Sequence, residues 1–145
     1  MKKIIAIQSR ADKINRAVIK QTWDWLKRNP FCMEVIPAKR SAFNIITVLN
    51  IDGVRIGITT KGGNAESLRS QLDLFEQKNC DILICPCRTR GKTYETVKSF
   101  ERKGYDMDFI ESLEFSESTD HLIKEILKSQ VLRVKERSLP EAPIF

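Results

Sequence analysis

The stretch from Lys2 to Leu26 constrains the fold of this chain most strongly. An apolar run, Ile4 to Ile7, leads into a short polar segment, and apolar residues then recur at helical spacing. This pattern predicts a strand, a loop and a helix over 13–29, with Asp12 as the helix N-cap. A strand that feeds a helix through a short loop is typical of α/β proteins.

The rest of the chain continues this alternation of strand and helix patterns. Strands are expected over 32–36, 42–50, 54–60, 81–85 and 105–113, and helices over 65–78, before Gly104 and after Ser118 or Thr119. The Asp52-Gly53 pair predicts a tight hairpin, which makes the sheet mixed. Pro37 is expected to end its strand. The predicted fold class is therefore α/β, with three layers, a mostly parallel but mixed sheet, and helices on both faces.

The length and composition set limits on domains and location. We expect a single α/β domain over 1–137 and a loosely ordered tail over 138–145. The apolar runs are too short to span a bilayer or to form a signal-peptide core, so we expect a cytoplasmic protein without membrane contact. The four cysteines fit buried thiols better than disulfides or metal ligands. His121, the only histidine, is expected on the surface.

Charge is distributed unevenly along the chain. Residues 1–40 hold ten Lys or Arg against three Asp or Glu, whereas residues 106–125 hold seven acidic residues against one Lys. A basic side favours an anionic partner, which would be an anionic small molecule, a nucleotide or, as an alternative, nucleic acid.

Three polar loops follow strands of the predicted sheet, at 8–13, 59–64 and 88–93. Ligands of open α/β sheets bind beyond the carboxyl ends of the strands, so these loops are expected to converge on an anion or phosphate. Ordinary solvated loops are the alternative. The candidate ligand-binding residues are Arg10, Lys13, Lys61, Gly62, Gly63, Asn64, Arg88, Thr89, Arg90, Gly91, Lys92 and Thr93. No catalytic residue and no metal ligand is predicted.

The triplet Gly91-Lys92-Thr93 comes close to a Walker A motif, with Pro86 in place of the first glycine. One interpretation is a true P-loop. However, a Walker A loop normally opens the nucleotide-binding core, and only about fifty residues follow this one. We therefore favour the second interpretation, a helix start that suits phosphate.

Over about residues 2–115 the chain resembles a small P-loop NTPase-like family of bacterial proteins. The resemblance rests on the first strand–loop–helix unit, the Asp52-Gly53 hairpin, the Gly62-Gly63-Asn64 turn, and the run 79–85 that leads into 88–91. It implies a P-loop NTPase-like fold. Members that keep Walker A carry Gly-x-x-x-x-Gly-Lys-Thr in the first loop, and the corresponding residues here are Gln8, Lys13, Ile14 and Asn15. The loop is thus a degenerate Walker A, in which Lys13 lies one residue early.

These features favour a binding protein over an enzyme. We expect a P-loop-like domain that binds a nucleotide or phosphorylated ligand with little or no hydrolysis. Asp81 begins its strand, so it does not stand where a Walker B acid would, and magnesium is not expected. The alternative is an accessory protein whose basic loops bind nucleic acid or protein. An enzyme would require Lys92 to act in catalysis.

Overall fold

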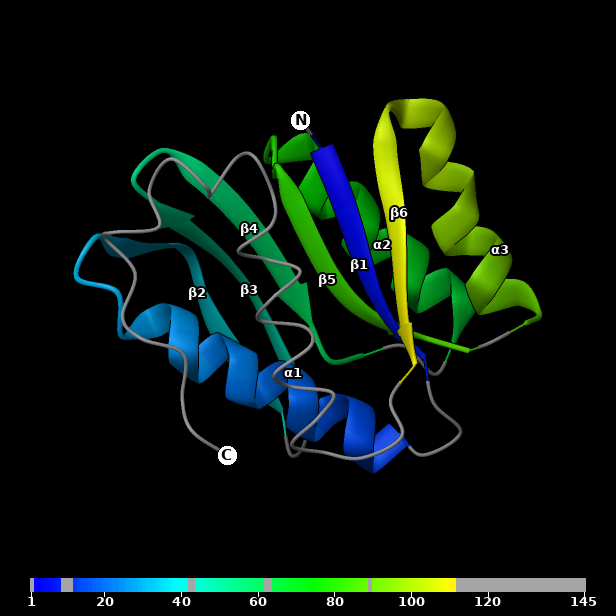
Figure 1. The fold of residues 1–145 in the computed structure, drawn as a ribbon, viewed down its shortest axis with the longest axis horizontal. Coiled ribbons are helices and arrows are strands. Elements are labelled where there is room, and N and C mark those ends of the chain that lie inside the picture. Colours follow the sequence, from blue (N-terminus) through cyan, green and yellow to red (C-terminus); the bar gives the residue numbers. More distant parts are fainter. Residues whose placement is uncertain (1, 9–11, 42–43, 62–63, 89, 112–145) are drawn as a thin grey trace.

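The computed structural model describes residues 2–8, 12–41, 44–61, 64–88 and 90–111 (Figure 1). The elements are β1 (Lys2–Gln8), α1 (Asp12–Lys27), β2 (Cys32–Ser41), β3 (Asn44–Ile51), β4 (Val54–Thr59), α2 (Ala65–Gln77), β5 (Ile82–Cys87), α3 (Lys92–Lys98), the 3₁₀ helix η1 (Ser99–Lys103) and β6 (Tyr105–Glu111). The predicted helix after Ser118, His121 and the predicted tail lie outside the described residues.

One sheet holds all six strands, in the order β2-β3-β4-β5-β1-β6. The pairs β4·β5, β5·β1 and β1·β6 are parallel, whereas β2·β3 and β3·β4 are antiparallel. The predicted α/β class and mixed sheet are therefore confirmed. The sheet is only partly parallel, because the hairpins around β3 reverse the chain twice.

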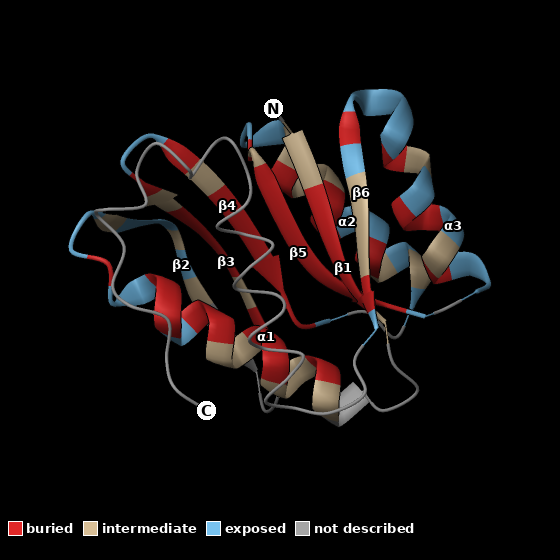
Figure 2. Cartoon of the chain, viewed as in Figure 1, coloured by how far each residue is buried: buried red, intermediate tan, exposed pale blue. Residues whose placement is uncertain are grey.

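Helices cover both faces of the sheet, as predicted (Figure 1). On one face α1 packs its apolar side, which includes Val18 and Trp25, against the strands. On the other face α2 and α3 pack against them, with Phe75 from α2 and Val97 from α3. Successive residues of a strand point to opposite faces, so the buried strands contribute to both cores. Strands β1 and β5 are buried over most of their length (Figure 2). Trp23 and Trp25 are both buried, as their expected packing role requires.

The hairpin between β3 and β4 has the predicted turn. Asp52 has φ 50° and Gly53 has φ 92°, so both central residues adopt the left-handed conformation that a two-residue hairpin of this type needs. Asparagine, aspartate and glycine tolerate this conformation best. The local sequence therefore fixes the register between these two strands.

Two predicted boundaries are wrong. Strand β2 does not end before Pro37 but runs through it to Ser41. It lies at the edge of the sheet, where a missing N–H is tolerated, and its register with β3 shifts on either side of Ile36. Asp12 is the first residue of α1 and not its N-cap. The helix before Gly104 is split into α3 and η1, and Gly104 ends it with φ 89°, as predicted.

In the part of the chain that the structure describes, none of the helices has the length and apolar character required to cross a membrane.

Candidate functional site

The parallel strands β4, β5, β1 and β6 all end at the same edge of the sheet, which we call the carboxyl edge. Their last residues there are Thr59, Cys87, Gln8 and Glu111. The three polar loops that the sequence singles out follow the first three of these residues. The strand directions therefore place the starts of all three loops at one edge of the sheet.

Strands β1 and β5 are neighbours whose chains leave the carboxyl edge toward opposite faces. From β1 the chain continues into α1 on one face, and from β5 it continues into α3 on the other (Figure 1). The strand ends at Gln8 and Cys87 are thus neighbours at the carboxyl edge, with α1 and α3 beyond them on opposite faces of the sheet.

The Gln8 side chain ties the two strand ends together. Its Nε2 donates a hydrogen bond to the carbonyl oxygen of Arg88, 3.3 Å away, and lies 3.8 Å from the Cys87 Sγ. The Cys87 thiol itself donates to the Arg88 carbonyl oxygen at 3.0 Å. Burial raises the pKa of the Cys87 thiol to about 11, so this thiol stays protonated at neutral pH.

The loop from Arg88 to Thr93 closes on itself at the start of α3. The Arg88 backbone N–H donates to the hydroxyl oxygen of Thr93, which is buried, at 3.2 Å. Gly91 has φ 95°, a left-handed conformation that glycine adopts without strain. The hydrogen bond thus links Arg88 to the start of α3, and the side chains of Arg88, Arg90 and Lys92 are exposed.

Four exposed cations follow the carboxyl ends of β4 and β5: Lys61, Arg88, Arg90 and Lys92. None of them forms a salt bridge with a residue that the structure describes. By contrast, Lys98 and Lys103 elsewhere on the surface pair with carboxylates at 2.8 and 3.1 Å. Cations that have no carboxylate partner among the described residues create a positive potential at this edge, which attracts anions.

The loop after β4 is also internally bonded. The Thr59 hydroxyl hydrogen-bonds to Gln71 of α2 and accepts the backbone N–H of Lys61 at 3.1 Å. The Asn64 side-chain oxygen accepts the backbone N–H groups of Glu66 and Ser67 at 2.8 and 3.2 Å. Asn64 is therefore the N-cap of α2, as predicted, and its oxygen is already used for that purpose.

Replacing Asn64 with alanine is expected to lower the free energy of unfolding by about 0.5–2 kcal/mol, because two helix N–H groups lose their acceptor. Asn64→Asp, which keeps an acceptor oxygen at the N-cap, should preserve most of the stability. Urea denaturation of both variants measures the difference. Equal stabilities of the alanine and aspartate variants would show that the cap does not stabilise α2.

The predicted ligand-binding residues fall into two groups. Those that the structure describes at the carboxyl edge are Lys61, Asn64, Arg88, Arg90, Gly91, Lys92 and Thr93. Lys13 belongs to the first turn of α1. Arg10, Gly62, Gly63 and Thr89 lie outside the described residues.

Three residues near this edge were not predicted as site residues. The first is Gln8, whose contacts reach a loop 80 positions away. The second is Asn15, a buried residue of α1 whose Oδ1 has no hydrogen-bond partner among the residues that the structure describes. The sequence does hold a signal for Asn15, because it is a polar residue on an apolar helix face, one turn before Val18 and Ile19. The third is Glu111, an exposed carboxylate in register with Gln8.

Asp81 lies at the opposite edge of the sheet from these loops. Its Oδ2 accepts the backbone N–H of Arg55 at 3.1 Å. This carboxylate therefore has a structural partner at the amino end of β5, far from the three loops. Within the described ranges, no three or more His, Cys, Asp or Glu side chains are grouped as a metal ion would need.

Comparison of the chain with protein-family models, with curated proteins and with solved structures finds no significant match.

Proposed function

We propose that the chain is a P-loop-like domain that binds a nucleotide or another phosphorylated ligand at the carboxyl edge, with little or no hydrolysis. The observation that carries this proposal is the position of the carboxyl ends of β1, β4 and β5 at one edge of the sheet, where exposed cations follow β4 and β5. In open α/β sheets phosphate groups bind beyond this edge, where backbone N–H groups and cations meet.

The charges support an anionic ligand. Lys61, Arg88, Arg90 and Lys92 are exposed and have no carboxylate partner among the described residues. A hydrogen bond between a cation and a phosphate oxygen contributes roughly 1.5–3 kcal/mol.

Weak or absent hydrolysis follows from the composition of the first loop. Gln8 and Asn15 stand where a Walker A loop has its first glycine and its threonine. The glycine that lets the backbone wrap the phosphate and the hydroxyl that binds magnesium are therefore both replaced. Asp81, held by the Arg55 N–H, is remote from the site. Binding without turnover is the activity that these residues favour.

A thermal-shift experiment with sodium tripolyphosphate and with ATP, each with and without magnesium, tests the proposal. A ligand at one hundred times its Kd stabilises the native state by about 2.7 kcal/mol, which raises the Tm by several degrees in a domain of this size. The variant that removes the cations after β5 is Arg88→Ala/Arg90→Ala/Lys92→Ala. Its affinity for either ligand should fall at least about tenfold, because each loss removes a charged hydrogen bond.

The matched control removes three exposed cations from the opposite edge of the sheet. These are Arg28, Lys78 and Arg102, which precede β2, β5 and β6. The control variant has the same net charge as the edge variant, and it should bind like the wild type. An equal loss in both variants would mean that only net charge matters and would contradict the site. A salt-sensitive shift with oligonucleotides alone would favour the nucleic-acid accessory instead.

A further inference from the structure

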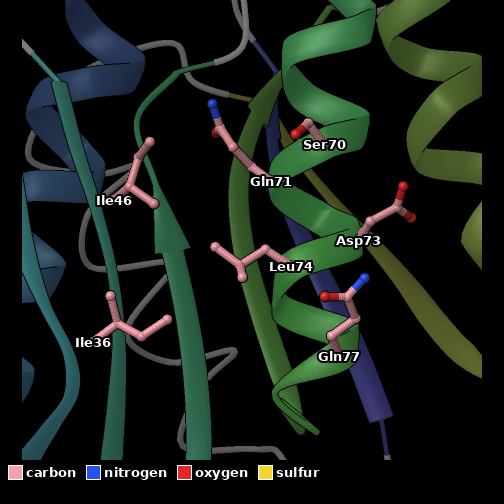
Figure 3. Close-up of a pocket in the computed structure, with 7 residues that line it drawn as sticks. All are labelled: Ile36, Ile46, Ser70, Gln71, Asp73, Leu74 and Gln77. Carbon is pink, nitrogen blue, oxygen red and sulfur yellow. The ribbon is translucent and has the colours of Figure 1, made fainter.

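A groove of about 510 Å³ lies between α2 and the β2–β3 side of the sheet (Figure 3). Its lining residues are Ile36, Ile46, Ser70, Gln71, Asp73, Leu74 and Gln77. Small-molecule sites in proteins usually have volumes of roughly 300–1,000 Å³. The groove is therefore of a size suited to a small organic molecule.

The groove has an apolar floor and a polar rim. Leu74 points from α2 across the gap toward Ile46 of β3 and Ile36 of β2, whereas Gln71 and Gln77 lie toward its two ends (Figure 3). The two glutamines are six residues apart on α2, which corresponds to about 9 Å along the helix axis. An apolar group such as an aromatic ring fits the floor of the groove, where the two glutamines can donate or accept hydrogen bonds at its ends.

One end of the groove reaches the carboxyl edge. Ile46 is the register partner of Thr59, the last residue of β4. The Thr59 hydroxyl hydrogen-bonds to Gln71 and also accepts the backbone N–H of Lys61. Two residues span at most about 7 Å of chain, so Lys61 begins within one side-chain length of the groove. The hydrogen bonds of Thr59 thus link the Gln71 end of the groove to the segment that bears Lys61.

We infer that this groove holds the apolar, ring-shaped part of a phosphate ester whose phosphate lies at the carboxyl edge. The inference rests on the proposed function, since it uses the same cations for the phosphate. Lys61, Arg88, Arg90 and Lys92 meet the anionic oxygens, while Ile36, Ile46 and Leu74 cover the ring. Burial of the ring supplies the affinity that an inorganic phosphate lacks.

Isothermal titration of the wild type with 1-naphthyl phosphate and with inorganic phosphate tests this inference. The aryl ester should bind at least about tenfold more tightly, because it removes apolar surface of both partners from water. Two variants at one position separate the groove from the rest of the fold. Leu74→Trp fills the groove and should abolish the preference for the ester, whereas Leu74→Met keeps an apolar side chain of similar volume and should retain it.

Methyl NMR of the wild type provides a second readout that does not depend on a variant. The δ-methyl signals of Ile36 and Ile46 should shift with 1-naphthyl phosphate and stay unchanged with inorganic phosphate. Equal affinities of the two ligands, or an unchanged preference in Leu74→Trp, would overturn the groove inference and leave the phosphate site intact. If inorganic phosphate and tripolyphosphate do not bind at all, the proposed function fails. An ester that still moves both methyl signals would then leave the groove as a binding site of its own.

Discussion

Replacing Phe75 with alanine is expected to lower the free energy of unfolding by about 3–5 kcal/mol. Phe75 is fully buried in the core between α2 and the sheet. Its ring lies over Gly57 of β4, where an added Cβ would be 2.5 Å from the Phe75 Cγ. The aromatic side chain therefore fixes α2 directly on the sheet, and its loss leaves a cavity that the backbone of Gly57 cannot fill. Urea denaturation followed by circular dichroism measures the change.

The contact between Gly57 and Phe75 can be tested by a double-mutant cycle. Gly57→Ala alone should destabilise the fold by roughly 1–3 kcal/mol, because its methyl group collides with the ring. In the Gly57→Ala/Phe75→Ala variant the methyl group occupies space that the ring has left. The combined loss should thus be smaller than the sum of the two single losses. Additive losses would show that the glycine does not serve to accommodate the ring.

Alkaline pH is expected to destabilise the protein strongly. Burial raises the pKa of the Cys80 thiol to about 12 and that of Cys87 to about 11, and it raises the pKa of Cys85 well above the ordinary 9.0. Above pH 9 the unfolded chain loses these protons while the folded chain keeps them, so stability falls as the pH rises. Each thiol contributes about 1.4 kcal/mol per pH unit until its folded pKa is reached.

Urea denaturation at pH 8, 9, 10 and 10.5 measures this decline. The contribution of Cys87 should level off near pH 11 and that of Cys80 near pH 12. Cys87→Ala serves as the control. Its free energy of unfolding should fall less steeply between pH 9 and 10.5 than that of the wild type, because one buried thiol is missing. A free energy of unfolding that stays constant from pH 8 to 10.5 would contradict the burial of these thiols.

Features that depend on a few neighbouring residues could be predicted from the sequence. The Asp52-Gly53 turn follows from the preference of these residues for positive φ, and the Asn64 cap from the affinity of its side chain for helix N–H groups. The apolar run of β5 predicted a strand buried on both faces, and the structure confirms it. In each case a local preference agrees with the tertiary fold.

Features that depend on distant contacts could not be predicted. Pro37 stays within β2 because that strand is at the sheet edge, and the strand order that puts it there is not encoded locally. The contact of Gln8 with the Arg88 carbonyl likewise requires β1 and β5 to be neighbours. The groove beside Leu74 arises where α2 leaves part of the β2–β3 face uncovered, which only the packing of the elements determines.

Backbone amide NMR during a titration with tripolyphosphate tests anion binding at the carboxyl edge most directly. The largest chemical-shift changes should occur at Gln8, Lys61 and the residues from Arg88 to Thr93, since these residues end or follow β1, β4 and β5 at the carboxyl edge. Amides near Arg28, Lys78 and Arg102, at the opposite edge, should stay unchanged. Chemical-shift changes concentrated at that opposite edge, or spread evenly over every basic residue, would contradict a specific anion site at the carboxyl edge.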